Sequence, residues 1–463
     1  MVNIFRAVTD CAFGRRLHKR LAPAAIALSA VLAGACQAPS QLFVDQPLQT
    51  GEPLKIGVLV PDGDYSTISL PIIDAMLLMR DTVNACGGVN QAPVSLAFYD
   101  YDADRRTEAM GLKHLVNDVG VHGVVAMLSD PVSLNTLAIA LDQNVGVVSP
   151  NATTTVQAKR RSALRGWGQL SLSEAQQGRA LARLAIAQGW QRANLLTSDT
   201  EPGLRFAQTF IRAFEALGGT VVNRNRLARY PSDQPAGSGR SGPFLATPAP
   251  TKAQRTVLDA PAIEALTRDL TRDVDVLVAS LDGRRGYRLL RSVIEQNSGD
   301  RPILLTHSAA LPAFGEGRWQ RINADNPYVF SGAQGLMPAV NTDILQALRA
   351  RWQSAETLQW GEYAPQAWDA AALLVLAAEA AGRNWRAGLQ AKLKPVANPP
   401  GVRVTQICEG LAHLRKGVMI NYQGASGAVD LGTDGQLAAT AQYRRWQISN
   451  SGKIRWGDNV TLK

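Results

Sequence analysis

The sequence predicts an α/β fold with two lobes, each built around a doubly wound parallel β-sheet. Short apolar, β-rich segments alternate with amphipathic segments of helical length between residues 54 and 307. Consecutive parallel strands need such helical connections, and the helices cover both faces of the sheet. The alternation runs through residues 54–149 and starts again at residue 174, which indicates two lobes and not one long sheet.

The first set of segments begins with LKIGVLV at 54–60, a short apolar strand. An amphipathic helix is expected from about residue 70 to 85, where CGG ends it. The remaining elements of this set are strands at 93–100, 121–128 and 145–149 and helices at 105–118 and 132–143.

The second set has the same alternation. Its expected strands are 193–198, 219–224, 274–280 and 302–307, and its expected helices are 174–189, 203–217, 260–272 and 284–296. Residues 231–254, rich in Pro, Gly and Ser, interrupt this set. Such a composition predicts a flexible surface insertion in the second lobe.

Length and composition indicate a globular protein. The chain has 463 residues, of which 46% are hydrophobic and 19% charged, enough for two or three ordinary domains. Its formal net charge of +10 could suggest a nucleic-acid partner. Part of that charge lies in the first 20 residues, and no Lys/Arg-rich block with interleaved aromatic residues follows, so we expect no nucleic acid to bind.

The N-terminus has the pattern of an export signal. Basic residues precede LAPAAIALSAVLAGA at 21–35, an apolar run too short to span a bilayer as a mature helix. LAGAC resembles a bacterial lipobox, which makes Cys36 the expected site of lipid attachment and residues 37–53 a linker behind the signal peptide at 1–36. An ordinary secretory signal cut nearby stays open. Either alternative places the protein in the periplasm or cell envelope.

Cys86 and Cys408 are the cysteines that follow the linker. An exported protein can form disulfides. The sequence leaves open whether these two pair or stay free.

Short polar residues follow two strands of the first set. Ser129, Asp130 and Ser133 follow the third strand, and Ser149, Asn151 and Thr153–Thr155 follow the fourth. Ligands of open parallel sheets bind at the carboxyl ends of the strands, and hydroxyl and N–H groups suit a carboxylate. Ser and Thr also cap helices and close turns, so position alone does not choose between these roles.

The motifs, taken in order, resemble a known family. They are KIGVLVPDGDYS (55–66), NACGGVNQAPVSLAFYDYDAD (84–104), GVVSPNATTT (146–155), YAPQAWDAA (363–371) and NYQGASGAVDLGTDGQ (421–436). Over roughly residues 54–450 the chain resembles the type I periplasmic solute-binding proteins, in particular the leucine/isoleucine/valine-binding group of ABC importers.

The resemblance implies two lobes joined by crossover strands that close over a small ligand. Lobe 1 would comprise residues 54–166 plus 336–424, and lobe 2 residues 167–335 plus 425–463. The expected ligand is a small carboxylate such as an amino acid or amide, and the expected protein partner is an ABC permease. Hinge segments are expected at 164–170, 332–337 and 424–429.

The resemblance also implies a set of ligand-binding positions. Those of the first lobe are Tyr65, Ser129, Asp130, Ser149, Ala152 and Thr153, and those of the second are Glu201, Asp282 and His307. The second lobe departs from the family pattern, with TEPG at 200–203 and His307 where amino-acid binders tend to have an acidic residue. Glu201 or Asp282 could still receive an ammonium group, so the ligand class stays open.

Other chemistry is weakly indicated. Asp100, Asp102 and Asp104 imitate the start of a calcium loop, but Arg105 and Gly111 stand where that loop needs Gly and Glu. The five His show no ligand spacing, and no P-loop, dinucleotide fingerprint or nucleophile elbow is present. We therefore expect no enzyme activity, cofactor or metal. The alternative function is an envelope lipoprotein that uses the same bilobed fold to bind a protein partner, such as a cell-wall synthase or a sensor.

Overall fold

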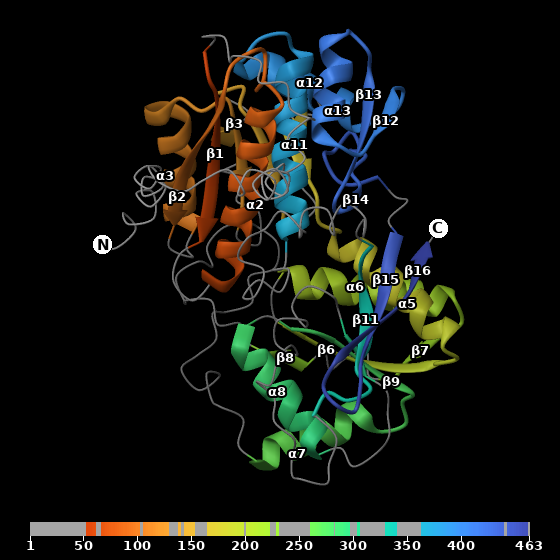
Figure 1. The fold of residues 1–463 in the computed structure, drawn as a ribbon. Coiled ribbons are helices and arrows are strands. Elements are labelled where there is room, and N and C mark those ends of the chain that lie inside the picture. The colour runs from red at the N-terminus through yellow and green to blue at the C-terminus, as the bar shows by residue number, and fades with distance from the viewer. Residues whose placement is uncertain are drawn as a thin grey trace, which may run out of the picture. The chain divides into compact units, whose positions relative to one another are not determined.

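The computed structural model describes most of the chain beyond the expected linker (Figure 1). The described residues are 52–61, 66–101, 105–128, 138–139, 143–152, 164–198, 201–222, 228–230, 260–281, 283–296, 303–305, 329–339, 363–438 and 442–461. The expected signal peptide with Cys36 and the expected insertion at 231–254 lie outside them. Among the described helices, none has the length and apolar character needed to cross a bilayer.

The first sheet has five parallel strands in the order β2-β1-β3-β4-β5. Their bounds are β1 Leu54–Pro61, β2 Val94–Tyr101, β3 Gly123–Ala126, β4 Gly146–Ser149 and β5 Trp167–Gln169. Every residue of β1 except Lys55 is buried, as expected for a strand covered on both faces. Parallel pairing aligns the carboxyl ends of all five strands along one edge.

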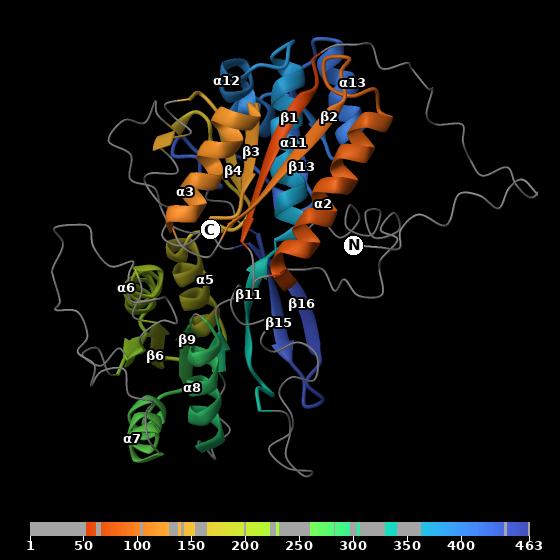
Figure 2. The ribbon, with the colours of Figure 1, turned by 90° about the vertical axis from the view of Figure 1, so that its left-hand side faces the viewer.

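Helices cover both faces of this sheet (Figure 2). They are α2 Ser66–Ala85, α3 Arg105–His114 continued by a π-helical turn at Leu115–Val119, α11 Ala364–Ala380 and α12 Arg386–Ala397. Ile56 and Val58 of β1 pack with α2 and α11, whereas Leu59 packs with Leu112 and Leu115 on the opposite face. Alternate side chains of one strand thus enter two cores, which is the doubly wound arrangement that the sequence predicts.

Helix α11 is buried along its length. Every residue from Ala364 to Glu379 is buried, and the helix packs against α2, α12 and the first sheet. Figure 1 shows α11 beside α2, although nearly 300 residues separate them in the sequence. One face of the first sheet is therefore covered by a helix from a much later part of the chain.

The second sheet has eight strands in the order β16-β15-β11-β10-β9-β6-β7, with β8 also paired to β6. Their bounds are β6 Arg192–Ser198, β7 Thr220–Val221, β8 Ala228–Tyr230, β9 Val276–Ser280, β10 Ile303–Leu305, β11 Gln334–Pro338, β15 Gln442–Ile448 and β16 Ile454–Thr461. Pairing from β7 and β8 to β11 is parallel, and the hairpin β15–β16 adds two antiparallel strands. The helices of this half are α5 Glu174–Ala187, α6 Glu201–Ala216, α7 Ala260–Thr271 and α8 Gly283–Gln296.

The start of α5 is encoded locally. Ser173 and Gln176 form a capping box, in which the Ser173 side chain accepts from the Gln176 N–H and the Gln176 side chain accepts from the Ser173 N–H. This arrangement satisfies two donors that a helix start leaves without intrahelical partners. The helix consequently begins at the residue that the sequence predicts.

The chain passes between the two large sheets three times. It leaves the first sheet after β5, leaves the second after β11 to form α11, and leaves the first half again after a small sheet of β12 Val402–Val404, β13 Ile420–Gly424 and β14 Gly427–Ala428. Helix α13, Ile407–Arg415, lies between β12 and β13 in the sequence. The expected crossover strands correspond to these three connections.

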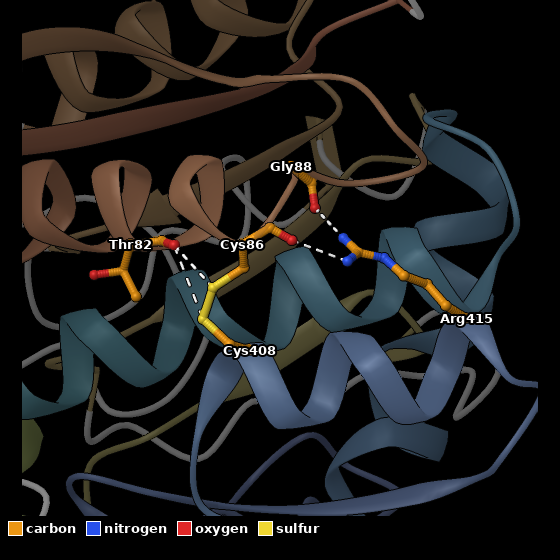
Figure 3. Close-up of a disulfide and its surroundings, with 5 residues drawn as sticks. All are labelled: Thr82, Cys86, Gly88, Cys408 and Arg415. Carbon is orange, nitrogen blue, oxygen red and sulfur yellow. Dashed lines mark hydrogen bonds between the residues drawn. A yellow bond between two sulfur atoms is a disulfide. The ribbon is translucent and has the colours of Figure 1, made fainter. Parts of the chain in front are cut away.

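A disulfide joins the residue that follows α2 to α13 (Figure 3). Cys86 pairs with Cys408, their Cα atoms are 5.7 Å apart, and 322 residues separate them. Arg415 donates to the carbonyl oxygens of Cys86 at 2.9 Å and Gly88 at 2.7 Å, which satisfies acceptors at the end of α2. Of the two alternatives that the sequence leaves open for these cysteines, the structure has the paired one.

Removing the disulfide should destabilise the protein. Because the crosslink spans most of the chain, replacing both cysteines by Ser should cost about 2–4 kcal/mol of unfolding free energy. Urea unfolding of the variant and of the wild type, each with and without dithiothreitol, measures this. The reduced wild type should match the variant, and an unfolding midpoint that reduction leaves unchanged would contradict a stabilising crosslink.

His122 links β1 to the chain just before β3. The ring Nδ1 of His122 accepts a hydrogen bond from the Lys55 backbone N–H at 3.0 Å, and the backbone N–H of His122 donates to the Lys55 carbonyl at 2.8 Å. An acceptor Nδ1 requires the neutral ring. Burial lowers the pKa of His122, while the charge of Glu52 acts in the opposite direction.

The unfolding free energy should depend on pH because His122 changes its protonation state. The folded-state pKa of His122 lies below 6.5. The neutral His122 ring therefore contributes to the unfolding free energy above pH 6.5, and this contribution is lost as the pH falls through the folded-state pKa. His122→Asn keeps an acceptor near the Nδ1 position and cannot titrate. The difference in unfolding free energy between wild type and variant should therefore shrink or reverse from pH 7.5 to 5. Parallel curves over this range would rule out the effect.

Candidate functional site

Polar side chains connect neighbouring strand ends of the first sheet. The Asn151 amide, just beyond β4, accepts from the Leu128 N–H at 2.9 Å and donates to the Leu128 carbonyl at 2.9 Å, just beyond β3. This pair of bonds imitates a β-ladder where the strands have already ended. Asn151 therefore fixes the positions at which the two following loops begin.

Ser149 supports the same turn. Its hydroxyl is fully buried, donates to Asn151 Oδ1 at 3.1 Å and accepts from the Ala152 N–H at 3.1 Å. Of the two roles that the sequence leaves open for these small polar residues, the bonds of Ser149 correspond to turn closure. The Ala152 N–H is used in the same turn, so both residues shape the strand end.

Further bonds extend this edge across the other strands. Beyond β5, the Ser171 hydroxyl donates to the Pro150 carbonyl at 2.5 Å, and at the end of β2 the Tyr101 hydroxyl donates to the Met127 carbonyl at 2.8 Å. At the end of β1, the Ser69 hydroxyl of α2 donates to the Pro61 carbonyl at 2.7 Å. The carboxyl edge of the first sheet is thus held by side chains that use backbone acceptors.

The predicted ligand-binding residues are distributed unevenly over the described part of the chain. Ser149 and Ala152 are described, and Glu201 is the first residue of α6, with its backbone placed. The predicted residues outside the described ranges are Tyr65, Ser129, Asp130, Thr153, Asp282 and His307.

Their positions in the sequence nevertheless share one topological feature. Tyr65, Ser129 and Thr153 follow β1, β3 and β4, which are neighbours in the first sheet. Glu201, Asp282 and His307 follow β6, β9 and β10, which are neighbours in the second. Each lobe thus carries its predicted residues after the carboxyl ends of three adjacent parallel strands, where ligands of open sheets bind.

Comparison with known proteins agrees with this topology. Residues 53–236 match the family model described as periplasmic binding protein. No curated protein matches the chain in sequence. Solved structures, by contrast, match it over nearly their whole length.

Three of these structures illustrate the match. A leucine-binding protein from Thermotoga maritima has 16% identity and a TM-score of 0.61, covering 88% of this chain and 99% of its own. A branched-chain amino acid transporter substrate-binding protein from Streptococcus pneumoniae, in complex with isoleucine, has 18% identity and a TM-score of 0.60, covering 89% and 100%. A solute-binding protein of an ABC transporter from Rhodopseudomonas palustris, in complex with p-hydroxybenzoic acid, has 15% identity and a TM-score of 0.64, covering 89% and 97%.

The chain has the type I periplasmic binding protein fold. The resemblance that the sequence motifs indicate is thereby confirmed for the fold. Asn151 is one of the polar residues that follow β4 in the sequence, but it is not among the expected ligand-binding positions. Its role in joining two strand ends of the periplasmic binding protein fold appears only when β3 and β4 are seen to be neighbours.

The hydrogen bonds of Asn151 at the carboxyl edge of the first sheet should contribute to the stability of the protein. Asn151→Leu has similar volume but leaves the Leu128 N–H and carbonyl without these partners, so it should cost about 1–3 kcal/mol of unfolding free energy. Urea unfolding measures the loss, with Asn117→Leu as the control because Asn117 is exposed on the π-helical turn. Equal stability of the two variants would show that the Asn151 bonds contribute nothing.

Proposed function

We propose that the protein is an extracytoplasmic solute-binding receptor of an ABC importer, with a small carboxylate such as an amino acid, an amide or a benzoate as its ligand. The observation that supports this proposal is the adjacency of β1, β3 and β4 in one sheet and of β6, β9 and β10 in the other, because most of the predicted residues follow these strands in the sequence. The ligands named for the solved structures of this fold, isoleucine and p-hydroxybenzoic acid, are both carboxylic acids.

The first lobe would hold the carboxylate. Ser129 follows Leu128 directly and Thr153 follows Ala152 directly, so both begin within one residue of the turn that Asn151 and Ser149 fix. Tyr65 and Asp130 would complete this half of the site.

The second lobe would determine the ligand class. Glu201 and Asp282 could pair with an ammonium group, which an amino acid has and a benzoate lacks. His307 could donate to a carboxylate or a phenolic hydroxyl. An amino-acid ligand therefore requires at least one of the two acidic residues, whereas a benzoate requires neither.

Binding would work by closure. Three connections join the two halves, and a ligand that contacts both half-sites stabilises the closed arrangement by its differential affinity for it. A permease would then recognise the loaded form. We further propose that the export signal is functional and that lipid on Cys36 anchors the receptor to the membrane, with residues 37–53 as a tether.

A thermal-shift screen tests the proposal. The purified protein is heated with a panel of amino acids, amides and benzoates, and a ligand at one hundred times its dissociation constant should add about 2.7 kcal/mol of stability. Thr153→Ala should abolish or strongly reduce the shift. Thr433→Ala should not, because the Thr433 side chain is exposed in another part of the fold.

The pattern of hits also separates the ligand classes. If Glu201→Gln or Asp282→Asn removes an amino-acid hit, the ammonium pairing holds. No shift with any member of the panel would overturn the solute-receptor proposal and favour the alternative, in which the same fold binds another envelope protein.

A further inference from the structure

Asp369 is a fully buried carboxylate on the apolar helix α11. Its Oδ1 accepts from the Tyr422 hydroxyl at 2.9 Å and the Ala425 N–H at 2.8 Å. Its Oδ2 accepts from the Ser426 N–H at 2.7 Å and from the Ser426 hydroxyl. Three donors from the 424–427 turn and one from β13 thus surround one carboxylate, at the beginning of the third connection between the sheets.

The glycines of this turn permit the close approach. A Cβ on Gly424 would lie 2.2 Å from the Asp369 carboxylate carbon, and Gly427 has a φ of 105° with the Ala339 carbonyl 2.8 Å from where its Cβ would be. Only glycine fits both demands. The glycines of GASG at 424–427 therefore allow the turn to pack against Asp369 on one side and against the second connection, at Ala339, on the other.

The chain beyond the turn is held as well. The Asn398 amide accepts from the Leu431 N–H at 2.7 Å and donates to its carbonyl at 2.8 Å. The Gly435 carbonyl accepts from the Gln169 N–H at 2.8 Å, at the end of β5. The third connection thus contacts the second near Ala339 and the first at Gln169.

We propose that Asp369 is the positioning residue of the connections: by holding the 424–427 turn on α11, it fixes the path of the third connection and, through Gly435, the end of β5. This inference rests on the proposed closure of two lobes for its functional meaning. In that setting, Asp369 would make residues 424–438 move with the first lobe, so closure would not bend them. This proposal differs from the expected hinge at 424–429 and from the expected assignment of residues 425–463 to lobe 2.

The protonation state of Asp369 gives this role a pH dependence. Burial raises the pKa of Asp369 to about 6, while the bonds from Ser426, Ala425 and Tyr422 act in the opposite direction. Tyr422 stays a neutral donor because burial raises its pKa well above 10. Among the described residues, no second charged side chain contributes to the shift of Asp369.

The ionised carboxylate accepts all four donors, whereas a protonated one presents an O–H on one oxygen and accepts poorly there. The turn should therefore loosen locally between pH 7 and pH 5. Global stability changes in the opposite direction, because the folded-state pKa lies above 3.8 and stability falls as the pH rises through about 6. Loosening of the 424–427 turn and the global unfolding free energy thus change in opposite directions with pH. Measuring both separates the positioning role of Asp369 from a merely structural one.

Hydrogen–deuterium exchange of the full-length protein tests the proposal without any ligand. Asp369→Asn should speed exchange at the Ala425 and Ser426 amides by about ten-fold or more, the size expected for lost bonds to a charged group. The effect should extend to the Gln169 amide, since Gly435 accepts its bond. After correction for intrinsic rates, the wild type should show the same changes from pH 7 to pH 5 and the variant should not.

Glu379→Gln is the matched control, because it neutralises a second buried carboxylate of α11. Glu379 accepts from the Asn90 N–H at 2.7 Å and pairs with Arg415 at 3.3 Å, so this variant should speed exchange near Asn90 and leave residues 424–438 unchanged. Ser426→Ala and Tyr422→Phe, which each remove one donor, should repeat the Asp369→Asn pattern at smaller amplitude even if that variant folds poorly.

Exchange that rises only at Ala425 and Ser426, or evenly over the chain, would overturn the positioning role. So would a pH profile shared by wild type and Asp369→Asn. Because no ligand is added, these outcomes are independent of the thermal-shift screen and of the proposed function.

Discussion

The arrangement of the whole chain depends on the burial of α11. This helix is apolar nearly all round and covers one face of the first sheet, yet it follows that sheet in sequence only after strands β6 to β11 of the second sheet. Burying it is favourable because each apolar side chain leaves water. The chain must therefore return from β11 to the first half, and that return makes the fold one of two halves joined by several connections.

The two carboxylates on α11 are exceptions to its apolar character, and each organises a distant segment. Asp369 holds the turn that begins the third connection, and Glu379 binds Arg415 and the Asn90 N–H. Burying a carboxylate costs free energy unless hydrogen-bond donors surround it. Each of these carboxylates therefore stabilises the packing of one specific segment. The same helix thus supplies the non-specific packing and two specific contacts.

The elements of the fold could be predicted from the sequence because they arise from local patterns. The capping box at Ser173 sets the start of α5, and the apolar run at Leu54–Val60 makes a buried strand. The expected helix at 70–85 begins earlier, at Ser66, in the structure. The second sheet also ends in an antiparallel hairpin, β15–β16, which the alternation of strands and helices does not encode.

The candidate site could be predicted only as positions after strand ends. That Ser149 closes a turn and Asn151 joins two strand ends depends on the pairing of β3 with β4, which brings Leu128 next to Asn151. The sequence shows a Ser or Thr near a predicted site in the same way whether its hydroxyl binds a ligand or a backbone N–H. The bonds that such a hydroxyl makes within the fold are visible only in the tertiary structure.

The sequence by itself determined the alternating elements, the two-lobed α/β class and the motifs typical of periplasmic binding proteins, since each depends on residues close together in the chain. Only the tertiary structure decided that Cys86 pairs with Cys408 across 322 residues and that Asp369 receives the GASG turn. Such contacts join residues whose separation in sequence says nothing about their separation in space. They exist because α11 is buried beside α2 and α13, which brings residues 66–85 and 407–415 to one core.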